Sequence, residues 1–265
     1  MRLRLLEHFR YAWQVLSGYR ARHEHAIALR RESDIAPYVD TRQALRVLDL
    51  ANGSLRPQYS ILRAAGHLVY GIDLVNGSQL TWTSMAYQVA RWLYAHQLGL
   101  PPESMSDGML VRGDVTNLPF SDSYFDLVTS VAAFEHFGDV PKVVSEVARV
   151  LRPSGLVWAS MHLFTSLSGG HNLSATQIPV LSLPPDIEPW DHLRRRGLPM
   201  RTPLNEWRRD QYLETFAGHF TLVKHYCARR EGEHLLTPKI QAELATFSFD
   251  ELTSRSYVIV GRKED

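Results

Sequence analysis

Three aspartates and one glycine stand where short apolar runs end, and their types suit the binding of a nucleoside. The aspartates are Asp49, Asp73 and Asp114, and Gly53 lies in a turn after the first run. A carboxylate after the second run accepts hydrogen bonds from both hydroxyls of a ribose. One after the third run accepts from an exocyclic amine such as that of adenine. Asp49 suits an ammonium group or a role in orienting the turn, and Gly53 lets a ligand approach the backbone.

Histidines supply candidate proton acceptors, because an imidazole is the side chain most often used for that task. Twelve are present, and the four nearest to expected strand ends or in a long loop are His136, His162, His171 and His192. His171 ranks first because Gly169 and Gly170 precede it and permit close approach to a ligand, and His162 ranks second. For each one, a satisfied core or surface histidine is the alternative. Their spacing matches no metal signature, so no metal site is predicted.

Strand and helix patterns alternate from Arg46 onward, which predicts an α/β fold with a mainly parallel sheet. Strands are expected at 45–50, 68–72, 109–112, 125–130, 156–161, 220–227 and 256–260, and helices at 57–66, 79–97, 140–151 and 209–216. The expected inner face of the helix at 79–97 consists of Trp82, Met85, Ala86, Val89, Trp92 and Leu93. Since ligands of open parallel sheets bind beyond the carboxyl ends of the strands, the three aspartates and Gly53 are expected to meet there.

Two segments depart from this alternation. Residues 1–44 form an expected N-terminal helical extension that is rich in arginine, either packed on the main domain or in contact with an anionic surface or a partner. Residues 45–265 form the main domain, with an insertion at about 164–208 that is rich in Ser, Gly and Pro and is typical of lids and binding loops. Its Trp190, Trp207 and Arg194 to Arg196 suit a sugar, phenolic or phosphate-bearing acceptor. The alternative is a loop that docks by its tryptophans and leaves the arginines solvated.

The overall composition and charge limit the kinds of binding partner and the cellular compartment that the sequence suggests. The net charge is +1 over 265 residues, and no apolar run approaches the roughly 20 residues needed to span a bilayer. No basic stripe favours nucleic acid, while peripheral membrane contact through the basic N-terminal helix stays open. A single cysteine, Cys227, fits a reducing, cytoplasmic location. The oligomeric state is not indicated.

Five ordered motifs resemble those of class I S-adenosylmethionine-dependent methyltransferases, most closely the small-molecule methyltransferase type 11 group. They are Val47 to Gly53, Gly71-Ile72-Asp73, Gly113-Asp114-Val115, Phe125 to Val128, and Glu146 to Gly155. The resemblance implies a doubly wound, Rossmann-like, seven-stranded sheet and S-adenosylmethionine as cofactor. It implies cofactor binding by Asp49, Ala51, Asn52, Gly53, Asp73, Leu74, Asp114, Val115 and Ser130. The function implied is methyl transfer to a small-molecule or glycan-like acceptor, with oxygen as the expected atom.

The first turn departs from the family pattern, which has glycines where this chain has Ala51 and Leu55. An alanine at position 51 is expected to be tolerated if its φ is negative, and Leu55 is expected to narrow the space beside the ligand. A non-catalytic binding or scaffolding protein with the same fold is therefore the alternative function. A nicotinamide-dependent oxidoreductase is a third reading, but the G-x-G-x-x-G fingerprint that it needs is absent.

Overall fold

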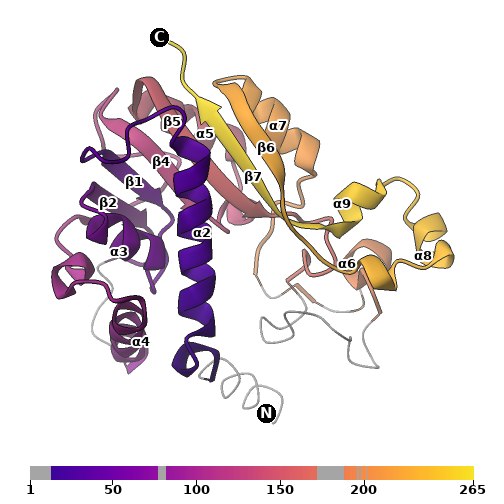
Figure 1. The fold of residues 1–265 in the computed structure, drawn as a ribbon. Coiled ribbons are helices and arrows are strands. Elements are labelled where there is room, and N and C mark those ends of the chain that lie inside the picture. The colour runs from indigo at the N-terminus through magenta and orange to yellow at the C-terminus, as the bar shows by residue number, and fades with distance from the viewer. Residues whose placement is uncertain (1–12, 77–81, 172–187, 196, 198, 201) are drawn as a thin grey trace.

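The fold is a seven-stranded sheet with helices on both faces (Figure 1). The computed structural model describes residues 13–76, 82–171, 188–195, 197, 199–200 and 202–265. The strands are β1 (Arg46–Leu50), β2 (Leu68–Asp73), β3 (Leu110–Arg112), β4 (Phe125–Val131), β5 (Leu151–His162), β6 (Thr221–Arg230) and β7 (Ser254–Arg262). Their order is β3-β2-β1-β4-β5-β7-β6. Every pairing is parallel except those of β7, which is antiparallel to β5 and β6. The predicted doubly wound, mainly parallel sheet is confirmed.

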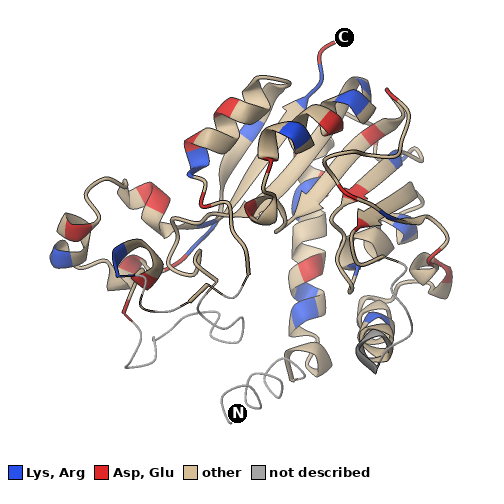
Figure 2. Ribbon diagram, turned by 180° about the vertical axis from the view of Figure 1, so that it is seen from behind, with Lys and Arg blue, Asp and Glu red and all other residues tan. Residues whose placement is uncertain are grey.

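Helices cover both faces of the sheet, so its central strands are buried on each side. The helices on these faces are α2 (Tyr19–Ile35), α3 (Pro57–Ala64), α5 (Val140–Val150) and α7 (Arg209–Ala217), and α4 (Trp82–Leu98) packs outside them. One buried cluster joins the sheet to α5 and α7, and a second joins it to α2 and α3. Basic and acidic residues are interspersed along the ribbon (Figure 2), in agreement with the balanced composition. None of the helices in the described ranges is long and apolar enough to cross a membrane.

The inner face predicted for α4 is wrong. Met85, Val89 and Trp92 are 45%, 59% and 57% exposed, whereas Tyr94 is buried. The reason is that α4 packs on α2 and the segment before it, in a cluster with Val15, and not directly on the sheet. The pattern of apolar residues therefore pointed to the wrong side of the helix. Leu93 is half-buried as expected, and the side chains of Trp82 and Ala86 lie outside the described part.

A second insertion, between β6 and β7, was missed by the sequence analysis. It contains α8 (Pro238–Glu243) and α9 (Phe249–Thr253), which lie beside α6 (Asp191–Arg194) at the same end of the sheet (Figure 1). Helices of six and five residues contain too few turns to produce a periodic pattern. The three helices share a small core that includes Leu167, Trp190 and Ile240.

The acceptor role suggested for Trp190 and Arg194 is not supported. Trp190 is 1% exposed and donates its indole N–H to the carbonyl of Leu252 at 3.1 Å. Arg194 forms ion pairs with Glu188 and Glu243. Among the other candidates, Arg195 also pairs with Glu188, Trp207 packs on Tyr212, and Arg196 lies outside the described residues. In the described part of this insertion, the tryptophans dock the loop and the arginines hold it by ion pairs.

A buried aspartate fixes α2 to the sheet. Asp34 is 3% exposed, and its carboxylate accepts hydrogen bonds from Trp158 Nε1, Lys224 Nζ and Tyr226 Oη at 2.9, 2.6 and 2.6 Å. These donors come from β5 and β6, so the carboxylate joins the helix to two strands.

Asp34→Ala is expected to lower the free energy of unfolding by about 3 kcal/mol, because three donors lose a buried charged acceptor. Urea denaturation with Glu32→Ala as the control on the same helix measures the difference. Equal stability of the two variants would contradict the role given to Asp34.

Candidate functional site

A cavity of about 600 Å³ opens at the carboxyl ends of β1, β2 and β4. Predicted cofactor residues contribute to its wall from three loops: Ala51, Asp73, Leu74, Asp114 and Val115. His136 and the segment after β4, including Ala132, complete it. The structure thus brings together five of the nine predicted cofactor residues on one surface.

The turn after β1 has an unusual backbone, which shapes this cavity. Ala51 has φ +55° and Gly53 has φ +65°, so the condition of a negative φ at Ala51 is not met. The conformation is held because the Ala51 N–H donates to the carbonyl of Ile72 at 2.8 Å and the Gly53 N–H to Asp73 Oδ2 at 2.8 Å. No atom lies within 4 Å of the place where a Cβ on Gly53 would stand. Leu55 packs on the cluster under α4, so it turns away from the cavity and does not narrow it.

Asp73 and Asp114 keep acceptor capacity toward the cavity. Asp73 Oδ1 accepts from the Val75 N–H at 3.0 Å, and Asp114 Oδ1 accepts from the Thr116 N–H at 2.9 Å. These bonds fix each carboxylate in its loop and leave lone pairs, since a carboxylate accepts about four hydrogen bonds. Two fixed carboxylates on neighbouring loops fit the ribose and the adenine amine of a nucleoside.

Asp49 is buried behind the first turn and does not line the cavity. Its Oδ2 has no hydrogen-bond partner among the described residues. Burial raises the pKa of this carboxyl to about 7, although the nearby Arg31 guanidinium opposes the rise. Burial likewise lowers the pKa of Arg31 to about 10, so neither charge is fully compensated. Because Asp49 is 3% exposed and outside the cavity wall, its position fits the role of orienting the turn better than contact with an ammonium group.

Asn52 and Ser130 have structural roles instead of the predicted binding roles. The Asn52 side chain accepts from Asn76 Nδ2 at 3.0 Å, and the same Nδ2 donates to the carbonyl of Val111 at 2.9 Å. Ser130 is 1% exposed and donates to the carbonyl of Leu50 at 3.2 Å. Both side chains therefore tie strand ends together beneath the cavity.

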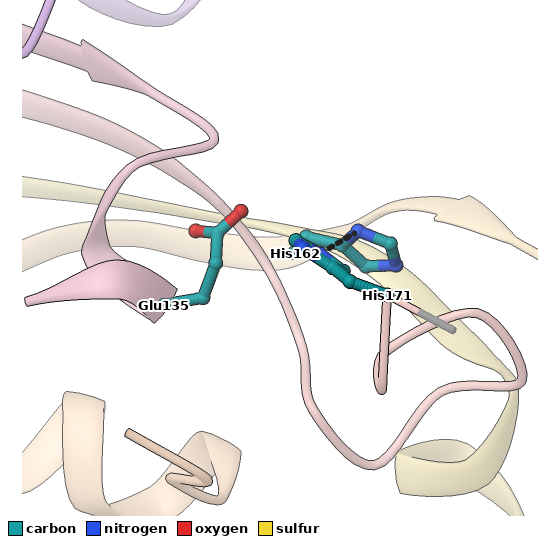
Figure 3. Close-up of side chains that lie close together, drawn as sticks. All are labelled: Glu135, His162 and His171. Carbon is teal, nitrogen blue, oxygen red and sulfur yellow. Dashed lines mark hydrogen bonds between the residues drawn. The ribbon is translucent and has the colours of Figure 1, made fainter. Parts of the chain in front are cut away.

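A cluster of His162, His171 and Glu135 lies next to the cavity (Figure 3). His162 Nδ1 and His171 Nε2 are 3.0 Å apart, and the carboxyl group of Glu135 points toward the pair. His162 Nε2 is 3.0 Å from Ser168 Oγ, which donates to Glu231 Oε1 at 2.6 Å. Both ring nitrogens of His162 are thus held in a fixed orientation.

Burial keeps the three groups of this cluster uncharged near neutral pH. It lowers the pKa of His171 to about 4 and that of His162 well below 6.5, and the charge of Arg255 acts in the same direction. It raises the pKa of Glu135 to about 8, against smaller opposite effects of the backbone N–H groups of Glu135 and His162. Neutral imidazoles are able to accept a proton across the neutral pH range.

Glu135→Gln is expected to raise stability at alkaline pH. The folded pKa of Glu135 lies above its unfolded value, so the folded state is progressively penalised as pH rises from about 4.5 through about 8. Glutamine mimics the protonated form and escapes that penalty, so the variant should gain on the order of 3 kcal/mol over the wild type at pH 9 and little at pH 5. Urea denaturation at both pH values measures the gain, and a pH-independent difference would contradict it.

The four predicted histidines divide into three that meet and one that does not. The ring of His171 lies 5.1 Å from that of His136 and 4.8 Å from that of His162. His192 is 2% exposed and bonds through Nε2 to the carbonyl of Phe164 at 2.8 Å. It does not line the cavity that contains Asp73 and Asp114. Sequence reasoning missed Glu135, although it lies beside His136, because nothing in the local pattern marks its burial.

The same cluster is the one group in the described part of the chain whose ligand atoms could hold a metal ion. Its three ligand atoms lie within 4.8 Å of one another. The sequence predicted no metal site because positions 135, 162 and 171 are far apart and follow no short signature. The fold alone brings them together.

A second cavity, of about 470 Å³, has one member of this cluster in its wall and is called the arginine cavity below. It is enclosed by α2 and by the ends of β4 to β7, and its wall includes Arg20, Arg30, Arg229 and Arg255. His162 also lines it, and Ala132 belongs to the walls of both cavities. Ala132 has φ +50°, where β4 turns away from the sheet. The two cavities therefore share one wall residue, Ala132.

Comparison with known proteins identifies the family of the domain. A family model described as a methyltransferase domain matches residues 48–159. A sterol 24-C-methyltransferase of Gibberella zeae is 30% identical over 160 residues, which cover 60% of this chain and 36% of that protein. A demethylmenaquinone methyltransferase of Thermotoga maritima is 32% identical over 111 residues, which cover 42% of this chain and 40% of that one. The chain thus spans less than half the length of these curated relatives.

Solved structures show the same fold at low sequence identity. A candidate sarcosine dimethylglycine methyltransferase of Galdieria sulphuraria superposes with a TM-score of 0.52 at 18% identity, covering 92% of this chain and 86% of that one. A candidate S-adenosylmethionine-dependent methyltransferase of Listeria monocytogenes gives 0.51 at 12% identity, covering 90% and 100%. Together with the match of residues 48–159 to the methyltransferase-domain model, these likenesses support a class I S-adenosylmethionine-dependent methyltransferase, and on their own they show its fold.

Proposed function

We propose that this protein transfers a methyl group from S-adenosylmethionine to an oxygen of a small-molecule or glycan-like acceptor seated in the arginine cavity. The observation that carries the proposal is that Ala132 lines both cavities while His162 lines the second one. One cavity has the carboxylates that suit a nucleoside. The other is of a size to admit a small molecule.

Each part of the site has a task in this proposal. Asp73 holds the ribose and Asp114 the adenine amine, while Asp49 lies behind the first turn and orients it. When bound, S-adenosylmethionine supplies a methyl group already activated on a sulfonium. His162 is the proton acceptor: the acceptor hydroxyl replaces His171 at His162 Nδ1, the nitrogen whose lone pair His171 Nε2 contacts at 3.0 Å, and its proton passes to that nitrogen, while Ser168 holds the ring through Nε2. The histidines that the sequence favoured thus exchange rank, since His162 lines the acceptor cavity.

The acceptor differs in kind from the one named for the sterol relatives. The arginine cavity has four guanidinium groups in its wall, and burying a sterol hydrocarbon against them would desolvate charges without compensation. A polar acceptor suits the wall better. The names of the relatives nevertheless make carbon methylation an outcome that the product analysis must distinguish.

The test is calorimetric binding of S-adenosylmethionine followed by methyl transfer from labelled cofactor to a panel of hydroxylated acids, phosphate esters and sugars. The expected result is binding with thermal stabilisation and label on oxygen of at least one compound. No binding would reject the proposal and favour the scaffolding alternative. Repeating turnover with a metal chelator tests the cluster: undiminished turnover supports His162 as proton acceptor, and loss restored by a divalent ion assigns the cluster to metal binding.

A further inference from the structure

The wall of the arginine cavity has a large excess of positive charge. Arg20 and Arg30 come from α2, Arg229 from β6 and Arg255 from β7, and among the described residues of this wall Glu24 is the sole acidic one. The overall chain is nearly neutral, with a net charge of +1. The four arginines come from three separate elements, so folding concentrates the charge in one place.

Two of these arginines have no ion pair among the described residues. No carboxylate lies within 4.0 Å of the guanidinium nitrogens of Arg30 or Arg229 in that part of the chain, whereas Arg255 has Glu231 at 3.7 Å. Burial raises the pKa of Glu24, which favours its neutral form. The cavity therefore keeps positive charge that the protein itself does not balance.

The pKa of a histidine in the same wall is affected by the positive charge of these arginines. His23 lies on α2 among the arginines, and its pKa is lowered to about 4, first by burial and then by Arg229, Arg20, Arg255 and Arg30. The same four guanidinium groups that line the cavity therefore repel a further positive charge there. An anion is stabilised where a cation is repelled.

We propose that the arginine cavity binds the carboxylate or phosphate group of an anionic acceptor, held by Arg229, Arg255 and the arginines of α2. This inference rests on the proposed function only in treating the bound molecule as a methyl acceptor. The anion site itself is argued from the cavity and its arginines alone. A guanidinium pairs with a planar carboxylate or a phosphate through two parallel N–H donors. A hydroxyl on the same molecule then lies toward His162, which lines the same cavity.

The experiment measures binding of inorganic phosphate and of malonate to the full chain saturated with S-adenosylhomocysteine, by calorimetry at constant ionic strength. Arg229→Gln is expected to weaken binding at least tenfold, since one charge-assisted pair is lost. Arg255→Gln is the second variant. Arg262→Gln is the matched control, because it changes an exposed arginine at the other end of β7. If phosphate binds more strongly than malonate, the anionic group of the acceptor is assigned as a phosphate. If malonate binds more strongly, it is assigned as a carboxylate.

Two outcomes would overturn the inference: no anion binding by the wild type, or equal weakening in Arg262→Gln and Arg229→Gln. The proposed function fails separately. If S-adenosylmethionine binds and only neutral acceptors are methylated, the anion site is wrong and the methyltransferase stands. If phosphate binds in an Arg229-dependent way but no cofactor binds, the anion site stands and the proposed function is wrong.

Discussion

Asp73→Ala is expected to weaken the binding of S-adenosylhomocysteine about 100-fold. The carboxylate is the predicted acceptor for the ribose hydroxyls, and hydrogen bonds to a charged group contribute about 1.5–3 kcal/mol each. It also accepts from the Gly53 and Val75 N–H groups at 2.8 and 3.0 Å. Its loss therefore removes a ligand contact and loosens the turn that carries the left-handed Ala51 and Gly53.

Calorimetry with S-adenosylhomocysteine measures this effect, with two comparison variants. Asp114→Asn keeps an acceptor for the Thr116 N–H and should weaken binding about tenfold, through the adenine contact alone. Asp210→Ala removes an exposed carboxylate on α7 and should leave the affinity unchanged. If folded Asp73→Ala binds within about threefold of the wild type, the nucleoside assignment of this cavity is wrong.

The sequence could predict the cofactor side of the site because that side depends on strand ends. In a parallel sheet, the residues that follow β1, β2 and β3 must lie at one edge, so Asp73, Asp114 and Ala51 met as expected. Asn52 and Ser130 also lie at this edge of the sheet, as the same rule predicts. Their side chains point into the protein because buried strand ends also need polar partners, which a pattern of residue types does not distinguish from ligand binding.

The acceptor side could be predicted only in part, because it depends on tertiary contacts over long distances in the chain. Arg20 and Arg255 lie 235 positions apart in the numbering, yet both line one cavity. Glu135 is recognised as part of the site only from its burial in the folded structure. Similarly, α4 showed a helical pattern whose partner, α2, was not evident from the sequence. Periodicity predicts that a face is apolar, but it does not identify what covers that face.

His162→Gln is expected to lower kcat by 10²- to 10⁴-fold, which is about the contribution of a positioned general base. The affinity for S-adenosylhomocysteine should stay within about twofold, because His162 lines the arginine cavity and not the cofactor cavity. Turnover of an acceptor found in the panel and calorimetry of the cofactor product separate the two quantities. His234→Gln, in the turn before α8, is the control that removes a histidine from an exposed position.

The pH profile distinguishes proton transfer from simple packing by His162. Because burial and Arg255 hold the pKa of His162 well below 6.5, and that of His171 at about 4, the wild type should keep its kcat as pH falls from 8 to about 5. A base with the ordinary pKa of a histidine would lose activity through 6.5. His171→Gln removes one of the charges that lower the pKa of His162, so its acid limb should move to higher pH, with KM little changed. An acid limb near 6.5 in the wild type, or one that His171→Gln leaves in place, would show that the pair does not carry the proton.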